Sequence, residues 1–230
     1  MHTKLITIEG IDGSGKTVQF RKLYDNLTAL GYSVDTKSFP VYDSFFGSQV
    51  GRLLKGEDGV IATDVDQKSM ALWFALDRLD AFRDWRDGEY DFLIINRYVL
   101  SNAVYQSIRD RDIGKPDIID WVFELEYERF RLPRPALNIF FDVNTERAGE
   151  NVDSKGFRDY VGGERRDVYE RSGGIQERAR QMYRTASERY DDVCIINCMD
   201  GGNMRTPDSI AADVMALLKK RGLIGPSEIN

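Results

Sequence analysis

The residues of this chain most able to do chemistry stand in one short run, residues 10–17, which reads Gly-Ile-Asp-Gly-Ser-Gly-Lys-Thr. This is a complete G-x-x-x-x-G-K-[ST] pattern, in which the backbone N–H groups of a glycine loop surround a phosphate chain. The lysine of such a loop reaches the terminal phosphates, and the hydroxyl that follows it ligates Mg²⁺. We therefore predict a site for a nucleoside triphosphate with Mg²⁺, formed by Gly10, Ile11, Asp12, Gly13, Ser14, Gly15, Lys16 and Thr17.

The segments on either side of this loop support that prediction. Residues 5–8 form a short, mostly β-branched run before it, which indicates a buried strand. Apolar residues recur at helical spacing over residues 16–30, and Gly31 stands where a helix C-cap glycine belongs. A chance match in a glycine-rich turn is the alternative, but a strand before the loop and a helix after it aim a helix N-terminus at the phosphates.

The elements that must position this loop can be predicted from the alternation of apolar runs with helical stretches. Five short runs indicate strands over residues 5–9, 33–39, 92–96, 138–143 and 193–197. Strands that alternate with helices predict an α/β, three-layer P-loop kinase fold, with a five-stranded, mostly parallel sheet flanked by helices. Ligands of such sheets bind at the carboxyl ends of the strands.

Three further segments complete the predicted organisation of a single domain over residues 1–230. Helices are expected over residues 67–85, with Asp66 as the N-cap, and from Pro207 onward, with Thr206 as the N-cap. Residues 150–174 have five glycines among charged residues and almost no apolar periodicity, so we expect a mobile lid there.

Composition excludes several classes of function. The only histidine is His2, which excludes Ser-His-Asp hydrolysis and histidine-ligated zinc. The net charge of −6 argues against general nucleic-acid binding, and the apolar runs are too short to cross a membrane. The first predicted strand begins close to the N-terminus and leaves no room for a signal peptide. We expect a cytoplasmic enzyme whose chemistry uses carboxylates, lysine, arginine and a metal ion.

One segment of this acidic protein is locally basic. Residues 155–184 contain eight Lys or Arg against five Asp or Glu. The excess suggests a phosphate-facing element, and the alternative is a solvated helix face with paired charges. From Arg178 onward the pattern is helical, and there we favour paired charges.

Five stretches, in order along the chain, resemble the thymidylate kinase family, whose members convert dTMP to dTDP. They are residues 8–17, Phe39-Pro40-Val41-Tyr42, Leu72 to Arg78, Arg97 to Gln106 and Leu132 to Pro135. The resemblance implies an ATP- and Mg²⁺-dependent kinase with dTMP as the acceptor. It also implies a homodimer, formed through helices that include residues 67–85, whose apolar positions exceed one stripe. A buried helix of a monomer would show the same pattern.

The resemblance also implies how a thymine nucleotide is recognised. Phe74 stacks on thymine and Arg78 hydrogen-bonds its O4, and the two residues are neighbours on a helix because they are four positions apart. The alternative is a core Phe74 and an Arg78 that extends to the surface. Asp12 and Tyr42 would contact the 3′-hydroxyl region, or else serve as an N-cap partner and a surface aromatic.

Residues that follow the third predicted strand are expected to bind the acceptor phosphate and the sugar. Arg97 stands at the carboxyl end of that strand, where a guanidinium can bind a phosphate in bidentate fashion. Asn102 and Tyr105 lie one helical turn apart and would face the same pocket. By resemblance, Tyr105 crowds the 2′ position of the sugar and so selects deoxyribose.

Catalysis in this family relies on cations. Some members carry a catalytic arginine in the phosphate loop and others carry it in the lid. The loop of this chain has none, so Arg158, Arg165 and Arg166 of the lid are the candidates, together with Lys16 and Arg97. An arginine that stabilises the transferring phosphoryl group can be worth about 10³–10⁵ in rate.

The chain departs from the family pattern at the predicted metal site. Asn96 stands where an aspartate is usual, so the Mg²⁺ shell loses a charge there. The predicted ligand is Thr17, with Glu9 and Asn96 as further candidates, and Glu9 or Asp12 would compensate for the lost charge.

A second departure concerns the acceptor phosphate. Val41 stands where the family usually has an arginine, and one charge-assisted hydrogen bond is worth about 1.5–3 kcal/mol. Weaker dTMP binding follows unless Arg52 or Lys55 substitutes.

Two other functions stay open at this stage. A deoxynucleoside kinase would need a carboxylate base for its hydroxyl acceptor, and Glu9 is available. A catalytically weak P-loop ATP-binding protein would account for Asn96 and Val41. We favour the monophosphate kinase because the acceptor phosphate is already anionic near neutral pH and needs no strong base.

Overall fold

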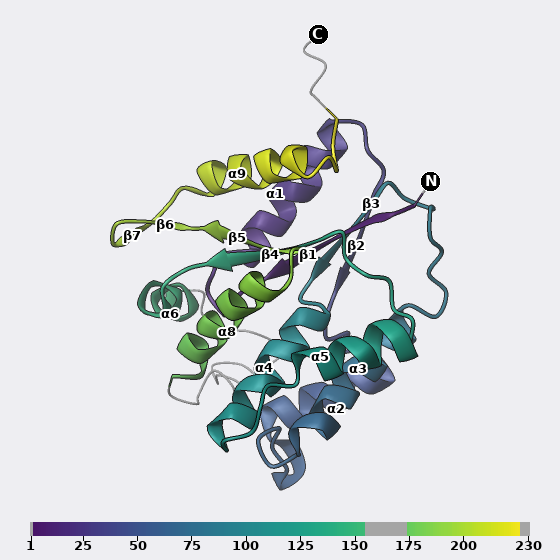
Figure 1. Cartoon of the computed structure of the whole chain (residues 1–230), viewed down its shortest axis with the longest axis vertical. Coiled ribbons are helices and arrows are strands. Elements are labelled where there is room, and N and C mark those ends of the chain that lie inside the picture. Colours follow the sequence, from purple (N-terminus) through teal and green to yellow (C-terminus); the bar gives the residue numbers. More distant parts are fainter. Residues whose placement is uncertain (1, 155–173, 226–230) are drawn as a thin grey trace.

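The computed structural model describes residues 2–154 and 174–225, and its centre is a five-stranded parallel sheet (Figure 1). The strands are β1 (Lys4–Glu9), β2 (Val34–Ser38), β3 (Phe92–Asn96), β4 (Leu137–Asp142) and β5 (Val193–Asn197). They are ordered β2-β3-β1-β4-β5, and each pairing between neighbours is parallel. The predicted fold is confirmed, and the bounds of each predicted strand agree within one residue.

The central strands are continuous apolar runs because helices cover both faces of the sheet. In β3, Phe92 to Ile95 have no exposed surface. On one face lie α1 (Lys16–Ala29) and α9 (Pro207–Lys220), and on the other lie α4 (Val99–Asp112) and α8 (Ile175–Arg189) (Figure 1). The remaining elements are α2 (Phe45–Lys55), η1 (Glu57–Gly59), α3 (Gln67–Ala81), α5 (Ile119–Phe123), the π-helix η2 (Glu124–Arg129), α6 (Thr145–Ser154), and the short strands β6 (Met199–Asp200) and β7 (Asn203–Met204).

The predicted helix starts are confirmed by their caps. Asp66 accepts hydrogen bonds from the backbone N–H groups of Lys68 and Ser69, at 2.9 and 3.1 Å. Thr206 accepts one from the N–H of Ser209 at 3.3 Å. Each cap satisfies N–H groups that have no partner within the helix.

Two predicted boundaries were wrong. The helix expected over residues 67–85 ends at Ala81, because Phe82 turns into an aromatic cluster with Phe39 and Tyr98, at ring distances of 6.2 and 5.9 Å. Residues 150–154, which were expected to belong to the loop, are the last part of α6. Residues 155–173 of the predicted lid lie outside the described residues, so the lid and the single-domain organisation stay predictions.

The carboxyl ends of β1 and β3 lie side by side and place the phosphate loop next to Arg97. Ile8 pairs with Asn96 in the register of the two strands. The Arg97 N–H then donates to the Ile8 carbonyl at 3.1 Å. Across 2–154 and 174–225, no helix is long and apolar enough to cross a membrane.

Candidate active site

The phosphate loop joins β1 to α1 and has the backbone of an anion cradle. Gly13 and Gly15 adopt φ of 79° and 84°, a region that favours glycine. A Cβ at Gly13 would lie 2.0 Å from the carbonyl oxygen of Ala148, so α6 packs directly on the loop. No side chain caps the first N–H groups of α1, and the buried hydroxyl of Ser14 has no partner within the described structure. These features fit a polyphosphate.

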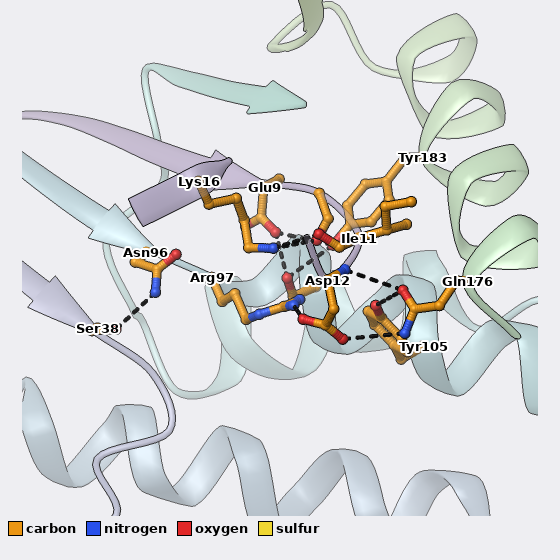
Figure 2. Close-up of polar contacts among 12 residues, drawn as sticks. Glu9, Ile11, Asp12, Lys16, Ser38, Asn96, Arg97, Tyr105, Gln176 and Tyr183 are labelled. Carbon is orange, nitrogen blue, oxygen red and sulfur yellow. Dashed lines mark hydrogen bonds and ion pairs between the residues drawn. The ribbon is translucent and has the colours of Figure 1, made fainter. Parts of the chain in front are cut away.

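Lys16 spans the loop that it follows. Its Nζ donates to the carbonyl oxygens of Gly10 and Ile11, at 3.0 and 2.7 Å (Figure 2). Phosphate oxygens can replace these two carbonyl oxygens as acceptors for Nζ, because Lys16 already lies against the loop. Thr17 is exposed at the start of α1. Among the described residues, no group of three or more acidic, His or Cys side chains is placed to hold a metal ion. Thr17 stays the predicted ligand of Mg²⁺, with Glu9 and Asn96 as further candidates.

Glu9, at the end of β1, is fully buried and bound by donors at both oxygens. Oε1 accepts from the backbone N–H of Tyr98 at 2.9 Å. Oε2 accepts from the hydroxyl of Ser101 and, at 3.2 Å, from that of Tyr183. Burial raises the pKa of Glu9, and these hydrogen bonds oppose the rise. These hydrogen bonds connect Glu9, at the end of β1, to α4 and α8. The role of Glu9 as a metal ligand stays a prediction.

Arg97 and the phosphate loop meet through an ion pair. The Arg97 guanidinium binds the Asp12 carboxylate, and both side chains are about one fifth exposed, at 21% and 20%. The guanidinium also lies over the Tyr105 ring, 5.8 Å from its centre. Arg97 has φ of 59°, an uncommon conformation for a residue with a Cβ. Such strain persists where the surrounding structure holds it, often at functional sites.

A residue that the sequence analysis missed, Gln176, completes this cluster. Its Nε2 donates to Asp12 Oδ2 at 3.1 Å, and its Oε1 accepts from the Asp12 N–H at 3.2 Å. The Tyr105 hydroxyl donates to the same oxygen at 3.3 Å. Figure 2 shows Arg97 and Gln176 approaching Asp12 from opposite sides. The available signal was position, because Gln176 is the second residue of α8, directly after the predicted lid.

The residues predicted to read the base form a second cluster. Arg78 is only 2% exposed, and its Nε and Nη2 donate to Glu126, at 2.5 and 2.6 Å. The alternative that Arg78 extends to the surface is therefore wrong. Asn102 donates to the same carboxylate at 2.9 Å, while Phe74 is half-buried against the core. None of the described contacts of Arg78 reaches the phosphate loop.

Helix α4 connects the two clusters. Asn102 contacts Glu126 in the cluster that contains Arg78. Tyr105, one turn later, contacts Gln176 in the cluster that contains Asp12. Glu126 is a second residue that the sequence analysis missed. The sequence gives no signal that singles it out, because Glu126 stands between two other acids, Glu124 and Glu128, and only its burial in the fold distinguishes it.

Comparison with known proteins decides the family. The family model described as thymidylate kinase matches residues 8–199. Thymidylate kinase of Mycobacterium tuberculosis is 37% identical over 182 residues, which cover 78% of this chain and 83% of that protein. The chain belongs to the thymidylate kinase family. The probable thymidylate kinase of Thermococcus onnurineus is 27% identical over 93% of this chain and 96% of its own length. The solved structure of thymidylate kinase from Candida albicans superposes with a TM-score of 0.70 over 98% of this chain and 96% of its own, at 21% identity, and supports the fold.

The two departures from the family pattern can now be placed. The Asn96 amide nitrogen donates to Ser38 at 2.9 Å (Figure 2), and its buried oxygen has no partner in the described part of the chain. Arg52 and Lys55 both lie near Glu57, at 3.8 and 3.5 Å. These cations are paired with a carboxylate in this structure, and their use as substitutes for the missing arginine stays a prediction.

The other predicted residues divide between described and undescribed segments. The ring of Tyr42 packs on α2, where a Cβ at Gly51 would lie 3.0 Å from it. The predicted catalytic arginines of the lid, Arg158, Arg165 and Arg166, lie outside the described residues.

The arginines of α8 carry paired charges, as predicted. Arg180 and Arg184 both bind Asp142, at 2.6 and 3.1 Å, and Arg178 pairs with Asp112 at 3.2 Å. Charges that are paired in this way belong to a helix face and need no phosphate ligand.

Proposed function

We propose that this chain transfers the γ-phosphate of ATP to dTMP and releases dTDP and ADP. The observation that carries the proposal is the Arg97–Asp12 pair at the edge of the glycine loop. It sets a cation suited to an acceptor phosphate beside the cradle suited to the donor's phosphates. Two phosphates that react must be held close and in line, which is most of what such an enzyme has to do.

The role of each residue in the proposed reaction follows from its charge. The loop N–H groups, Lys16 and Thr17 hold the donor, and Arg97 exchanges its contact with Asp12 for the acceptor phosphate. Mg²⁺, when bound, neutralises charge on the donor phosphates. Lid arginines Arg158, Arg165 and Arg166 are the candidates for stabilising the transferring group. The acceptor oxygen is already anionic, so no general base is required.

The substrate contacts follow the two clusters. Phe74, Arg78 and Asn102 would bind thymine. Tyr105 would sit against the sugar and disfavour a 2′-hydroxyl, with Asp12 and Tyr42 near the 3′-hydroxyl. The geometry of Glu9 argues against the deoxynucleoside kinase, because the carboxylate has no exposed surface and already accepts three hydrogen bonds from the protein.

The test measures dTDP formation from ATP and Mg²⁺ with dTMP or thymidine as the acceptor, by chromatography of the products. We expect turnover of dTMP, little of thymidine, and loss of turnover in Lys16→Ala. Turnover of thymidine alone would favour the deoxynucleoside kinase. Tight ATP binding without any dTDP would favour the catalytically weak binding protein, and a gain in Asn96→Asp/Val41→Arg would then locate the cause.

We also propose a homodimer through α3. Leu72 and Leu79 are exposed at 37% and 36% although apolar, and they lie seven positions apart on one side of the helix. Aromatic contacts continue from Trp73 to Phe46 on α2, at 6.3 Å. Such a surface suits an isologous contact. Sedimentation velocity should give a dimer, and Leu72→Glu/Leu79→Glu should give a monomer. The cytoplasmic location stays a prediction.

A further inference from the structure

A buried carboxylate outside the predicted site organises the side chains that would read the base. Glu126 lies in η2 and has no exposed surface. It accepts two hydrogen bonds from Arg78, one at each oxygen, in a fork. Its Oε1 also accepts from Asn102 Nδ2 at 2.9 Å. One carboxylate therefore fixes a side chain of α3 and a side chain of α4 relative to each other.

Glu126 also helps to fix the orientation of the Asn102 side-chain amide. Asn102 Nδ2 donates both to Glu126 and to the carbonyl oxygen of Ala71, at 3.0 Å. Exchanging the amide nitrogen and oxygen would set the Asn102 oxygen against two other oxygens, because an ionised carboxylate only accepts. The amide oxygen is therefore held on the other side of the group.

That oxygen of Asn102 is a buried acceptor without a partner. It has no hydrogen bond within residues 2–154 and 174–225, although Asn102 is only 4% exposed. Buried polar atoms in proteins are normally paired, so an orphan of this kind points to a donor that arrives with a ligand.

Arg78 supplies the complementary group. Its third nitrogen, Nη1, has no acceptor in the described part of the chain, since its contacts are those with Glu126 and a ring contact with Phe39. The two side chains that donate to Glu126 Oε1 thus carry one further donor, Arg78 Nη1, and one further acceptor, the Asn102 oxygen. A pyrimidine with a carbonyl beside a ring N–H, as in thymine, matches both. Cytosine has an amino group and an unprotonated nitrogen at these places and matches neither.

We propose that Glu126 is the positioning residue that sets the preference for thymine over cytosine, without touching the nucleotide. The inference rests on the proposed function, because it assumes a pyrimidine nucleotide at this site. A glutamine at position 126 can donate to the Asn102 oxygen and so removes one of the two oxygens that oppose the turned amide, leaving only the carbonyl oxygen of Ala71. The Asn102 amide can then turn over more readily and offer its NH₂ group to the base, which suits cytosine.

The experiment compares dTMP with dCMP in wild type, Glu126→Gln and Asp142→Asn. Asp142 is the matched control, a buried acid bound by Arg180 and Arg184 away from this cluster. Dissociation constants come from calorimetry and kcat/KM from ADP release. We expect Glu126→Gln to reduce the dTMP:dCMP preference at least tenfold in both measurements, and Asp142→Asn to preserve it. A folded Glu126→Gln protein with an unchanged preference overturns the inference.

A second variant keeps the test decisive if Glu126→Gln does not fold. Asn102→Ala removes the acceptor and leaves the Arg78–Glu126 pair, so the preference should fall, and an unchanged preference again overturns the inference. In the double variant the two losses should be less than additive, because both act through the Asn102 oxygen. Preferential dTMP binding by wild type without dTDP formation refutes the proposed function alone. Formation of dTDP with an unaltered preference in Glu126→Gln refutes this inference alone.

Discussion

We expect the strained backbone of Arg97 to lower the free energy of unfolding, while it places the guanidinium at the acceptor site. Its φ of 59° lies in the left-handed region, which costs an L-residue about 1–2 kcal/mol. Asparagine enters this region more readily. Arg97→Asn would therefore relieve strain while it removes the guanidinium.

The sizes of the opposing terms can be worked out from the contacts of Arg97. Its ion pair with Asp12 is about one fifth exposed and worth about 0–1 kcal/mol, and its contact with the Tyr105 ring about 0.5–1 kcal/mol. The stability of Arg97→Asn should thus stay within about 1 kcal/mol of wild type, a Tm change of at most about 4 °C. Two lost charge-assisted bonds to the acceptor phosphate cost about 3–6 kcal/mol in kcat/KM, or about 10²–10⁴-fold.

Arg131 provides the matched control for this prediction. It has φ of 55°, is exposed and lies outside the proposed site. Arg131→Asn should relieve part of this cost, raise Tm by up to about 4 °C and leave dTMP turnover unchanged. Thermal melts and the ADP-release assay measure both variants. Turnover by Arg97→Asn within tenfold of wild type, or a fall in its Tm of more than about 10 °C, would refute the reasoning.

Three further predictions concern the loop, the buried acid and the missed glutamine. Gly13→Ala puts a methyl group 2.0 Å from the Ala148 oxygen, so we expect a loss of about 1–3 kcal/mol in unfolding free energy and weaker ATP binding by calorimetry; unchanged binding would contradict this. Because burial raises the pKa of Glu9 above its ordinary 4.5, its contribution to stability is full below pH 4.5 and is lost as pH rises through the raised value. The Tm of Glu9→Gln relative to wild type should therefore increase with pH above 4.5, and a constant difference in melts from pH 4 to 8 would sink this account. Gln176→Met removes a charge-assisted bond to Asp12, and kcat/KM for dTMP should fall about tenfold with KM for ATP unchanged; an unaltered value for dTMP would show that the contact is dispensable.

Local patterns predicted the fold because each strand carries its own signal. A parallel strand covered on both faces must be apolar throughout, and residues 92–95 are buried as such a run requires. The glycine loop is likewise a local device, since its glycines, lysine and helix start are consecutive. Boundaries were less predictable where distant packing intervened, as at Phe82, which leaves α3 to join aromatic residues of other elements.

The amino-acid sequence by itself determined the sheet, the phosphate cradle and the family to which the chain belongs, because these depend on the order and spacing of neighbouring residues. Only the tertiary structure decided the partners that orient the site. Glu126 meets Arg78 across 48 positions, and Gln176 meets Asp12 across 164. A single buried acid or glutamine leaves no periodic pattern, and its partner depends on which elements the topology brings together.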